Sequence, residues 1–459
     1  MIPALALPPQ PAASLPMKEK LRIWYEKYFD AEGFCEYLQL VYSPVINMPS
    51  AAPLKMVETL KEEVKLLQSA RATMLWKREL AFYWTDDKEA TLMRRFKSTV
   101  SPLDLRSQLV QLIPERVEYG PVYTSSPGNA ITAFVNVPQL AEIKFDIDIT
   151  DYERPCCAPT VKAACWLCWI QIRAAIRTIM LVMKKVFDAN DPCIVYSGLK
   201  GAHVVYSGYS LSSVDVVARE QIANVFIKDL SKSLSDRNQQ ELLSECFSIW
   251  REEFFNLNSH LRLRSCTDWI AIMKAQYPHF AKVLDHDLPL GPCNTADTAR
   301  NATSNFLGTS NRKSIATATG TIRRQGQGIW KQLTQAQHKN TSTLMYTEHV
   351  ADPRLSGSPT TISSDPGAMK KTKVETKEAV VTGTLSDLIV TMFAPRIDEG
   401  VLMEIGHLIK AWDCIHPVSK KRCVRIPMEL LMSFNPETVP TLDQILDNPE
   451  LYASKPDSK

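Results

Sequence analysis

The sequence lacks an excess of either charge. Its 459 residues include 53 lysines and arginines and 50 aspartates and glutamates, so the formal net charge is only +3. Overall charge therefore neither supports nor excludes a polyanionic partner, and any nucleic-acid surface must come from local clusters of basic residues. The chain is long enough to bury the core of two or three domains.

Segments that direct a chain into or across a membrane are also lacking. Residues 1–20 are proline-rich, carry no charge before Lys18 and precede the first arginine, Arg22, whereas a transit peptide carries arginines on an amphipathic helix. We predict that residues 1–20 form a disordered tail. The most apolar helix expected, 169–187, is interrupted by four basic residues, so we do not expect it to span a membrane.

No signal peptide precedes the eleven cysteines, so we expect a reducing, intracellular compartment. Four of the cysteines lie within thirteen residues: Cys156, Cys157, Cys165 and Cys168. Four thiolates suffice for a closed tetrahedral zinc site, and C-x-x-C is common in such sites. The alternative is a chance cluster of core thiols, because two nearby tryptophans show that the region is apolar. We favour zinc.

The hydrophobic pattern predicts an α/β (α+β) fold, with mixed β-sheets flanked by helices and a smaller helical subdomain. Helices are expected from Leu21, over 54–71, over 169–187 and across most of 210–285. Strands are expected over 78–84, 142–150, 193–197 and 202–207. The last two strands flank a turn with two glycines, which predicts a β-hairpin.

The amino-acid composition changes after residue 285. Residues 286–376 are rich in Thr, Ser, Asn, Gly and Pro, with one helix-like island at 329–337, and we expect a largely mobile insertion. Order is expected to return over 377–440, and a charged tail, 441–459, closes the chain.

Two aspartates lie one residue apart in the strand predicted over 142–150. Asp146 and Asp148 alternate with apolar residues, so both carboxylates point to the same face. Two like charges side by side repel each other unless a cation neutralises them, and a hard divalent metal is the natural candidate. The string D-I-D-I-T also fits the nucleophile and general acid of haloacid dehalogenase-like phosphatases. A non-catalytic zinc module that binds nucleic acid is the third interpretation.

The turn SGLKGAH, 197–203, gathers groups that bind phosphate. Its glycines let a phosphate approach the backbone, while Ser197, Lys200 and His203 offer donors. Alone it is an ordinary glycine turn; beside an acidic metal pair it becomes a candidate triphosphate site. A basic cluster follows downstream, which is either a second binding surface or a solvated loop: Lys410, His416, Lys420, Lys421, Arg422 and Arg425.

The order of these motifs resembles the small catalytic subunit of the archaeo-eukaryotic DNA primase. FDIDITDYE, the four cysteines, a long helix, VYSGLKGAH, APRID, GHLIK and IHP follow one another over roughly residues 20–285 and 380–430. Members of the family synthesise short RNA primers on single-stranded DNA, using two metal ions held by three aspartates. The resemblance implies a primase catalytic core over 21–285 and 377–440, with two catalytic Mg²⁺ or Mn²⁺ ions, one structural Zn²⁺ and ribonucleoside triphosphate substrates.

The resemblance also assigns roles to particular residues. Asp146 and Asp148 match the metal-binding D-x-D, and Asp398 in PRID matches the third aspartate. The nucleotide-contacting residues that it implies are Ser197, Lys200, His203, Lys410, His416, Arg422 and Arg95. For the last two the spacing leaves neighbours open, because Arg425 and Arg94 fit the same patterns.

Three departures from the family pattern stand out. Lys200 replaces the arginine of S-G-x-R-G-x-H, which keeps the charge but loses the bidentate fork. Seven residues separate Cys157 from Cys165, somewhat more than the family pattern. The additions at about 46–75 and 290–375 have no family counterpart, and we favour tolerated surface loops over partner-binding segments.

Finally, the resemblance implies partners and a location. The family's partner is the large primase subunit, often within a complex with the replicative DNA polymerase alpha. A single-stranded DNA template, a nuclear location and no membrane contact follow from the same resemblance.

Overall fold

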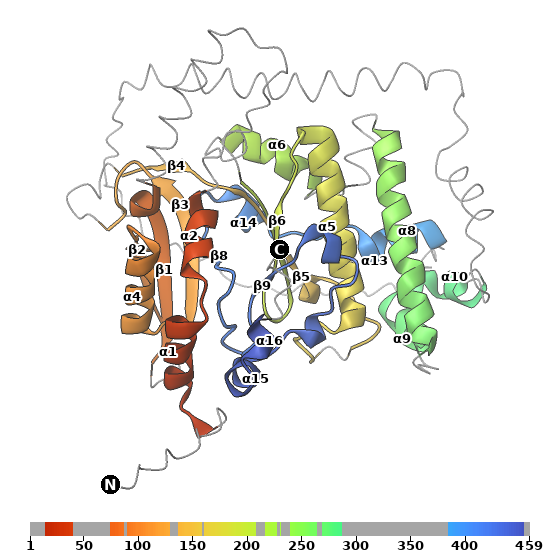
Figure 1. Ribbon diagram of the computed structural model, residues 1–459. Helices are drawn as coiled ribbons and strands as arrows, with labels where there is room; N and C mark the ends of the chain where they lie inside the picture. The colour runs from red at the N-terminus through yellow and green to blue at the C-terminus, as the bar shows by residue number, and fades with distance from the viewer. Residues whose placement is uncertain are drawn as a thin grey trace, which may run out of the picture.

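The computed structural model describes residues 14–39, 74–86, 90–128, 136–157, 160–207, 216–226, 230, 239–263, 269–286 and 384–453. Two sheets stand side by side and helices flank them (Figure 1), which confirms the predicted α/β (α+β) class. Mixed sheets are expected from the sequence, but every strand pair that the structure describes is antiparallel. The helix predicted over 54–71 and the predicted insertion beyond His286 lie outside the described residues.

The first sheet has five strands. Four of them follow the order β2-β1-β3-β4, and the fifth, β8, also pairs with β3. Its strands are β1 (Arg78–Thr85), β2 (Thr91–Lys97), β3 (Arg116–Tyr123), β4 (Pro138–Leu140) and β8 (Ile409–Lys410). Strand β1 is buried along almost its whole length, whereas β2 is an exposed edge strand. Leu80, Phe82 and Val117 pack in one core with apolar residues of three helices: α1 (Met17–Lys27), α2 (Ala31–Gln39) and α4 (Pro102–Leu112).

The second sheet has four strands in the order β5-β7-β6-β9. Its strands are β5 (Ile143–Asp148), β6 (Cys193–Tyr196), β7 (Gly201–Tyr206) and β9 (Val424–Arg425). The register pairs Asp146 with His203 and Asp148 with Gly201, and it confirms the predicted hairpin of β6 and β7. Because directly opposed residues share a face, Asp146 and His203 lie on one face of this sheet.

The other face of the second sheet packs against a long helix, α5 (Trp166–Phe187). Phe145, Ile147 and Val204 of the sheet belong to the same core as Trp169 and Ile176 of α5. Further helices surround this core: α6 (Val216–Phe226), α8 (Gln240–Leu263), α9 (Trp269–Gln276), α10 (Ala281–His286), α13 (Leu385–Phe393) and α14 (Glu399–Met403). The largely helical character predicted for 210–285 is confirmed for its described residues.

By length and composition alone, α5 could cross a membrane. However, 78% of its most apolar window is buried inside the molecule, between the second sheet and α8. Two of its basic residues, Arg173 and Arg177, form ion pairs with the fully buried Glu253 of α8. These features are those of a core helix, as the sequence analysis predicts.

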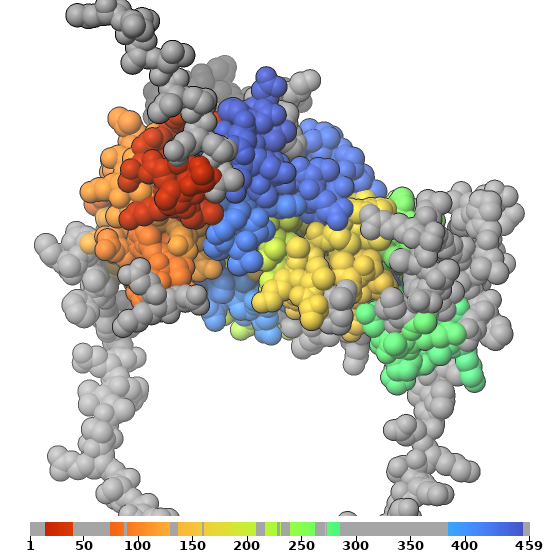
Figure 2. All heavy atoms as spheres, turned by 90° about the horizontal axis from the view of Figure 1, so that it is seen from below, coloured from red at the N-terminus to blue at the C-terminus, as the bar shows by residue number. Residues whose placement is uncertain are grey.

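Both predicted tails contain folded residues. Helix α1 begins at Met17, inside the segment 1–20, and residues of the segment 441–459 form α15 (Leu442–Asp447) and α16 (Glu450–Ala453). A capping box at Thr441 starts α15, and Leu442 and Ile445 are fully buried. Helices α1 and α15 are in contact, joined by an ion pair of 2.8 Å between Lys20 and Asp443. Figure 2 shows these N-terminal and C-terminal residues side by side.

The same junction contains a buried ion pair. Arg422 and Asp413 are 4% and 1% exposed, and their charged atoms lie 3.2 Å apart. Asp413 also accepts a hydrogen bond of 2.8 Å from the Asp30 N–H, and the ring of Tyr452 lies 5.1 Å from the Arg422 guanidinium. The guanidinium therefore connects the helices at the two ends of the described chain with the loop between β8 and β9.

We predict that Arg422→Met lowers the free energy of unfolding by about 3 kcal/mol, because it leaves the Asp413 carboxylate buried without its partner. Urea unfolding followed by circular dichroism measures this loss. Arg425→Met is the matched control, since Arg425 is exposed. Equal stability of the two variants would contradict the structural role of Arg422.

Candidate functional site

Three carboxylates meet where β5 ends and α14 begins. Asp146 and Asp148 lie on one face of β5, and Asp398 is the N-cap of α14. The backbone N–H of Asp398 donates a hydrogen bond of 3.2 Å to the carbonyl of Asp146, which fixes the two segments against each other. The structure thus brings together the three aspartates that are predicted to bind metal, although Asp398 lies 250 residues beyond Asp148 in the chain.

The electrostatics of this group favour a bound cation. Partial burial, together with the negative charges of Asp148 and Asp398, raises the pKa of Asp146 to about 7, against the opposing effect of Lys410. Carboxylates crowded in this way are stabilised when a divalent cation offsets their charge, and oxygen ligands suit Mg²⁺ or Mn²⁺. Carboxylate oxygens are thus the kind of donor that the predicted catalytic metals prefer, and their binding here stays a prediction.

The glycine turn 197–200 lies directly beside the carboxylates. Gly201 opposes Asp148, and a Cβ atom there would lie 1.8 Å from the carbonyl oxygen of Ile147, so only glycine fits. Gly198 has a φ of +92°, and a Cβ atom would come within 2.7 Å of His416. The two glycines thus let the turn approach both β5 and the loop that carries His416.

Lys200 makes an ion pair with one of the carboxylates. Its Nζ lies 3.1 Å from Oδ2 of Asp148, while Oδ1 accepts hydrogen bonds from the backbone N–H and the hydroxyl of Thr150. The ammonium is partly exposed and lies between the acidic group and the turn. From this position the Lys200 ammonium can neutralise Asp148 or donate to an oxygen of a phosphate group at the turn.

Two histidines of the site are neutral at physiological pH. Burial and the nearby positive charges lower the pKa of His203 and of His416 to about 3. Nδ1 of His416 accepts the N–H of Val418 at 3.1 Å, so its proton is on Nε2, which can donate to an anion. Nε2 of His203 lies 3.8 Å from Oδ1 of Asp146.

Lys410 and Ser197 complete the connection between the two sheets. Lys410 lies on β8, opposite Glu118 of β3, and its Nζ donates a hydrogen bond of 3.5 Å to the carbonyl of Ser197. The Ser197 hydroxyl accepts the N–H of Gly201 at 3.2 Å. The loop around His416 is held against the same turn, because the hydroxyl of Ser419 donates to the carbonyl of Gly198 at 2.6 Å.

The arginines predicted at the site lie in different environments. Arg422 is buried in the junction described above, whereas Arg425 is exposed on the face of the second sheet that carries Asp146. Arg95 donates to the buried Glu79 at 2.8 Å and to the carbonyl of Gly406 at 3.0 Å; Arg94 stacks on Trp84. Contact between any of these arginines and nucleotide stays a prediction.

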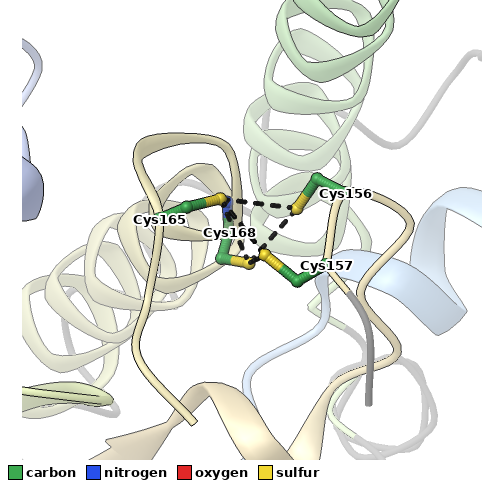
Figure 3. Close-up of side chains that lie close together, drawn as sticks. All are labelled: Cys156, Cys157, Cys165 and Cys168. Carbon is green, nitrogen blue, oxygen red and sulfur yellow. Dashed lines mark hydrogen bonds between the residues drawn. The ribbon is translucent and has the colours of Figure 1, made fainter. Parts of the chain in front are cut away.

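The four cysteines form a separate cluster at the start of α5 (Figure 3). Their sulfur atoms approach one another at 3.2 to 3.7 Å. A zinc ion with Zn–S bonds of about 2.3 Å gives S···S separations of about 3.8 Å, whereas a disulfide bond is about 2.05 Å long. Sγ of Cys165 also accepts the N–H of Cys168 at 3.4 Å. Cys156, Cys157, Cys165 and Cys168 could therefore hold one zinc ion, as predicted.

Sequence reasoning missed two buried cations that support the site. Arg219 of α6 is 1% exposed and donates to the carbonyl of Leu402 at 2.8 Å and to that of Glu142 at 3.0 Å. Lys144, two residues before Asp146, donates to the carbonyl of His407 at 3.2 Å. Both tie the start of β5 to the segment that follows Asp398. In the sequence, the one sign of Arg219 or Lys144 is a basic residue within an apolar stretch.

The fold and this site define an α/β protein in which a group of three aspartates adjoins a glycine turn flanked by lysines. A family model for the DNA primase small subunit matches residues 145–427. The DNA primase small subunit of Schizosaccharomyces pombe is 27% identical over 373 residues, which cover 80% of this chain and 70% of that protein. The chain belongs to the DNA primase small-subunit family and is of the eukaryotic type.

Two further relatives have the same description. The DNA primase small subunit of Drosophila melanogaster is 23% identical over 393 residues, covering 83% of this chain and 78% of that protein. The one from Saccharomyces cerevisiae is 23% identical over 364 residues, covering 76% of this chain and 73% of that protein. The resemblance drawn from the ordered motifs is thereby confirmed.

The topology is unlike that expected for a phosphatase of the haloacid dehalogenase type. That interpretation requires a Rossmann-like domain, whose sheet is mostly parallel. Here Asp146 lies on β5, at the edge of a sheet whose described pairs are all antiparallel. The D-I-D-I-T string is therefore placed in the wrong fold for that chemistry.

We predict that the purified protein contains about one equivalent of zinc, because four thiolates satisfy a tetrahedral site. Elemental analysis measures it, and the double variant Cys165→Ser, Cys168→Ser is expected to lose the metal. Cys193→Ser, outside the cluster, is the control and should keep it. Undiminished zinc in the double variant would contradict the assignment.

We also predict that stability falls below about pH 6.5. A histidine in the unfolded chain has a pKa near 6.5, whereas that of His416 in the folded protein is about 3. Between these values the unfolded state binds a proton that the native state does not, so the free energy of unfolding decreases as the pH falls. His203 acts in the same direction.

His416→Asn separates the contribution of this side chain. Asparagine can still accept the Val418 N–H but does not titrate, so the variant should lose less stability than wild type between pH 7 and pH 5. Urea unfolding at several pH values compares the two slopes. Parallel curves would show that native His416 titrates normally.

Proposed function

We propose that this chain is a DNA-directed RNA polymerase that synthesises short RNA primers on single-stranded DNA. The observation that carries the proposal is the meeting of Asp146, Asp148 and Asp398 with the turn 197–200. Membership of the DNA primase small-subunit family supports it. Carboxylates beside a cationic turn suit a reaction in which a triphosphate is bound and pyrophosphate leaves.

In this proposal the aspartates hold the catalytic metals. Asp146, Asp148 and Asp398 would hold two Mg²⁺ or Mn²⁺ ions, whose charge would lower the pKa of the attacking 3′ hydroxyl and stabilise the leaving pyrophosphate. The protein's contribution is to keep the carboxylates close in spite of their repulsion. The hydrogen bond from Asp398 to the carbonyl of Asp146 does this directly, and Arg219 and Lys144 brace both segments.

The cations of the site bind the triphosphate. The Nζ of Lys200 lies at Asp148 and that of Lys410 at the carbonyl of Ser197, so both ammonium groups adjoin the turn and can reach a phosphate bound there. Neutral His416 presents Nε2–H as a further donor. Backbone N–H groups of the glycine turn add donors without bulk. Lys200, as a single ammonium, contributes charge rather than the bidentate geometry of an arginine.

The remaining parts of the proposal follow from the family. The large primase subunit would be the partner, within a polymerase alpha complex, and the location would be the nucleus. The near-neutral net charge favours weak template binding by this chain alone, which suits a subunit that works beside a partner. The zinc cluster would brace the chain between β5 and α5.

We predict that Asp398→Asn lowers primer synthesis at least about 100-fold, since it removes one metal-binding charge. Asparagine still caps α14, so the fold should persist. The assay follows labelled oligoribonucleotides on a single-stranded template, with and without the large subunit. Asp146→Ala is expected to have the same effect.

Glu399→Gln is the matched control, because Glu399 is exposed next to Asp398 and its replacement leaves Asp398 as the N-cap of α14. Its primer synthesis should equal that of wild type. Template-dependent synthesis that survives both Asp398→Asn and Asp146→Ala would overturn the proposed function. A phosphomonoesterase that tolerates Asp398→Asn would instead support the phosphatase interpretation.

A further inference from the structure

Phe96 is an exposed aromatic residue with an unusual backbone. It lies near the end of the edge strand β2, where the pairing with β1 is irregular, and its φ is +58°. Bulky side chains rarely adopt this left-handed conformation, and residues that do so tend to occur at binding sites. The residue is 47% exposed, so its ring contributes little to the core.

A buried carboxylate holds this conformation in place. Glu79 is fully buried and accepts the N–H of Phe96 at 3.4 Å, the Nε–H of Arg95 at 2.8 Å and the hydroxyl of Tyr123 at 3.0 Å. On the other side, a Cβ atom at Gly128 would lie 3.0 Å from the carbonyl oxygen of Phe96. The surrounding residues therefore impose the strained backbone rather than merely tolerating it.

The ring is supported by two neighbours. The guanidinium of Arg95 lies over it at 5.2 Å, and the Tyr123 ring meets it edge to face at 6.4 Å. Arg95 cannot swing away easily, because Glu79 and the carbonyl of Gly406 both bind it. The result is a rigid, half-exposed aromatic surface with a fixed positive charge next to it.

This surface is connected to the candidate active site. Gly406, which accepts a hydrogen bond of 3.0 Å from Arg95, lies four residues before Lys410 in the segment that also contains Asp398. An aromatic ring beside a guanidinium is the combination that stacks on a nucleobase and attracts the adjoining phosphate. Nearly half of Phe96 is exposed, so its ring is open to such a base.

We propose that Phe96, backed by Arg95, is a stacking platform for a nucleobase. The proposal rests on the proposed function, which supplies two sources of that chemistry: an unpaired base of the DNA template and the base of the incoming ribonucleotide. Both present a flat π-face next to a phosphate. The experiment distinguishes the two sources.

The variants are chosen to separate stacking from folding. Phe96→Leu keeps an apolar side chain but removes the π-face, and Phe96→Tyr keeps the ring. Phe96→Gly removes the ring and at the same time relieves the positive φ, so it should unfold no more easily than wild type. Leu92→Ala is the matched control, because Leu92 is an exposed residue of the same strand.

Two measurements are made on each variant. Fluorescence anisotropy with a labelled oligodeoxythymidylate, without nucleotide, gives the affinity for the template. Primer synthesis at saturating template gives the KM for ribonucleotide. If the platform binds the template, Phe96→Leu and Phe96→Gly raise the Kd for oligodeoxythymidylate at least about fivefold. If it binds the incoming base, the same two variants raise the KM for ribonucleotide by the same factor. Phe96→Tyr should restore most of either loss, and Leu92→Ala should cause none.

The outcomes also separate this proposal from the proposed function. If wild type makes primers and both Phe96→Leu and Phe96→Gly match it in both measurements, the platform is wrong and the primase assignment stands. If wild type makes no primers but Phe96→Leu weakens binding to the oligodeoxythymidylate, the platform stands and the primase assignment fails. A wild-type protein that neither binds the oligonucleotide nor makes primers overturns both.

Discussion

Mutual repulsion among three carboxylates is the constraint on which the rest of the structure depends. Asp398 comes from a distant part of the chain, and burial together with the negative charges of Asp148 and Asp398 raises the pKa of Asp146. The fold opposes this repulsion with backbone contacts and buried cations rather than with apolar packing alone. Arg219 and Lys144 direct their positive charges at carbonyl groups on both sides of the acidic group. The acidic group is thus held by its surroundings before any ligand contributes.

Lys200 shows how one departure from the family pattern acts within this arrangement. An arginine could make two parallel hydrogen bonds to a phosphate, whereas the lysine ammonium is a point charge that also reaches Asp148. In the proposed function the same side chain would bind Asp148 and the phosphate in turn. The balance between these partners depends on charge rather than on geometry, so it should be sensitive to ionic strength.

The sequence predicts those parts of the molecule in which local pattern and burial agree. Alternation in 142–150 places the aspartates on one face, and the apolar spacing of 169–187 predicts the core helix α5, which begins three residues earlier. The four cysteines are close enough in sequence for their meeting to be expected. Glycines at 198 and 201 are informative because no other residue fits their positions.

Other features could not be predicted, because distant partners determine them. Arg422 occurs in a basic stretch and looks like a solvent-exposed ligand-binding residue, but its partner Asp413 and the ring of Tyr452 bury it. Helices α15 and α16 are too short for periodicity to be visible, and they are stabilised by docking on α1. Arg219 is one basic residue in an ordinary helix, and nothing nearby in the sequence indicates the carbonyl groups that it binds.

The junction of the two ends of the described chain has a consequence for how the molecule is made. The Tyr452 hydroxyl donates to the carbonyl of Tyr28 across 424 residues of sequence, and the loop that carries His416 is held between these ends. Contacts of such long separation form late, because the entropy of closing the loop must be overcome first. During synthesis on the ribosome, the part of the core around α5 that precedes residue 286 can assemble while the loop that carries His416 still lacks its support. In the proposed function, competence to bind nucleotide would therefore be among the last properties that the growing chain acquires.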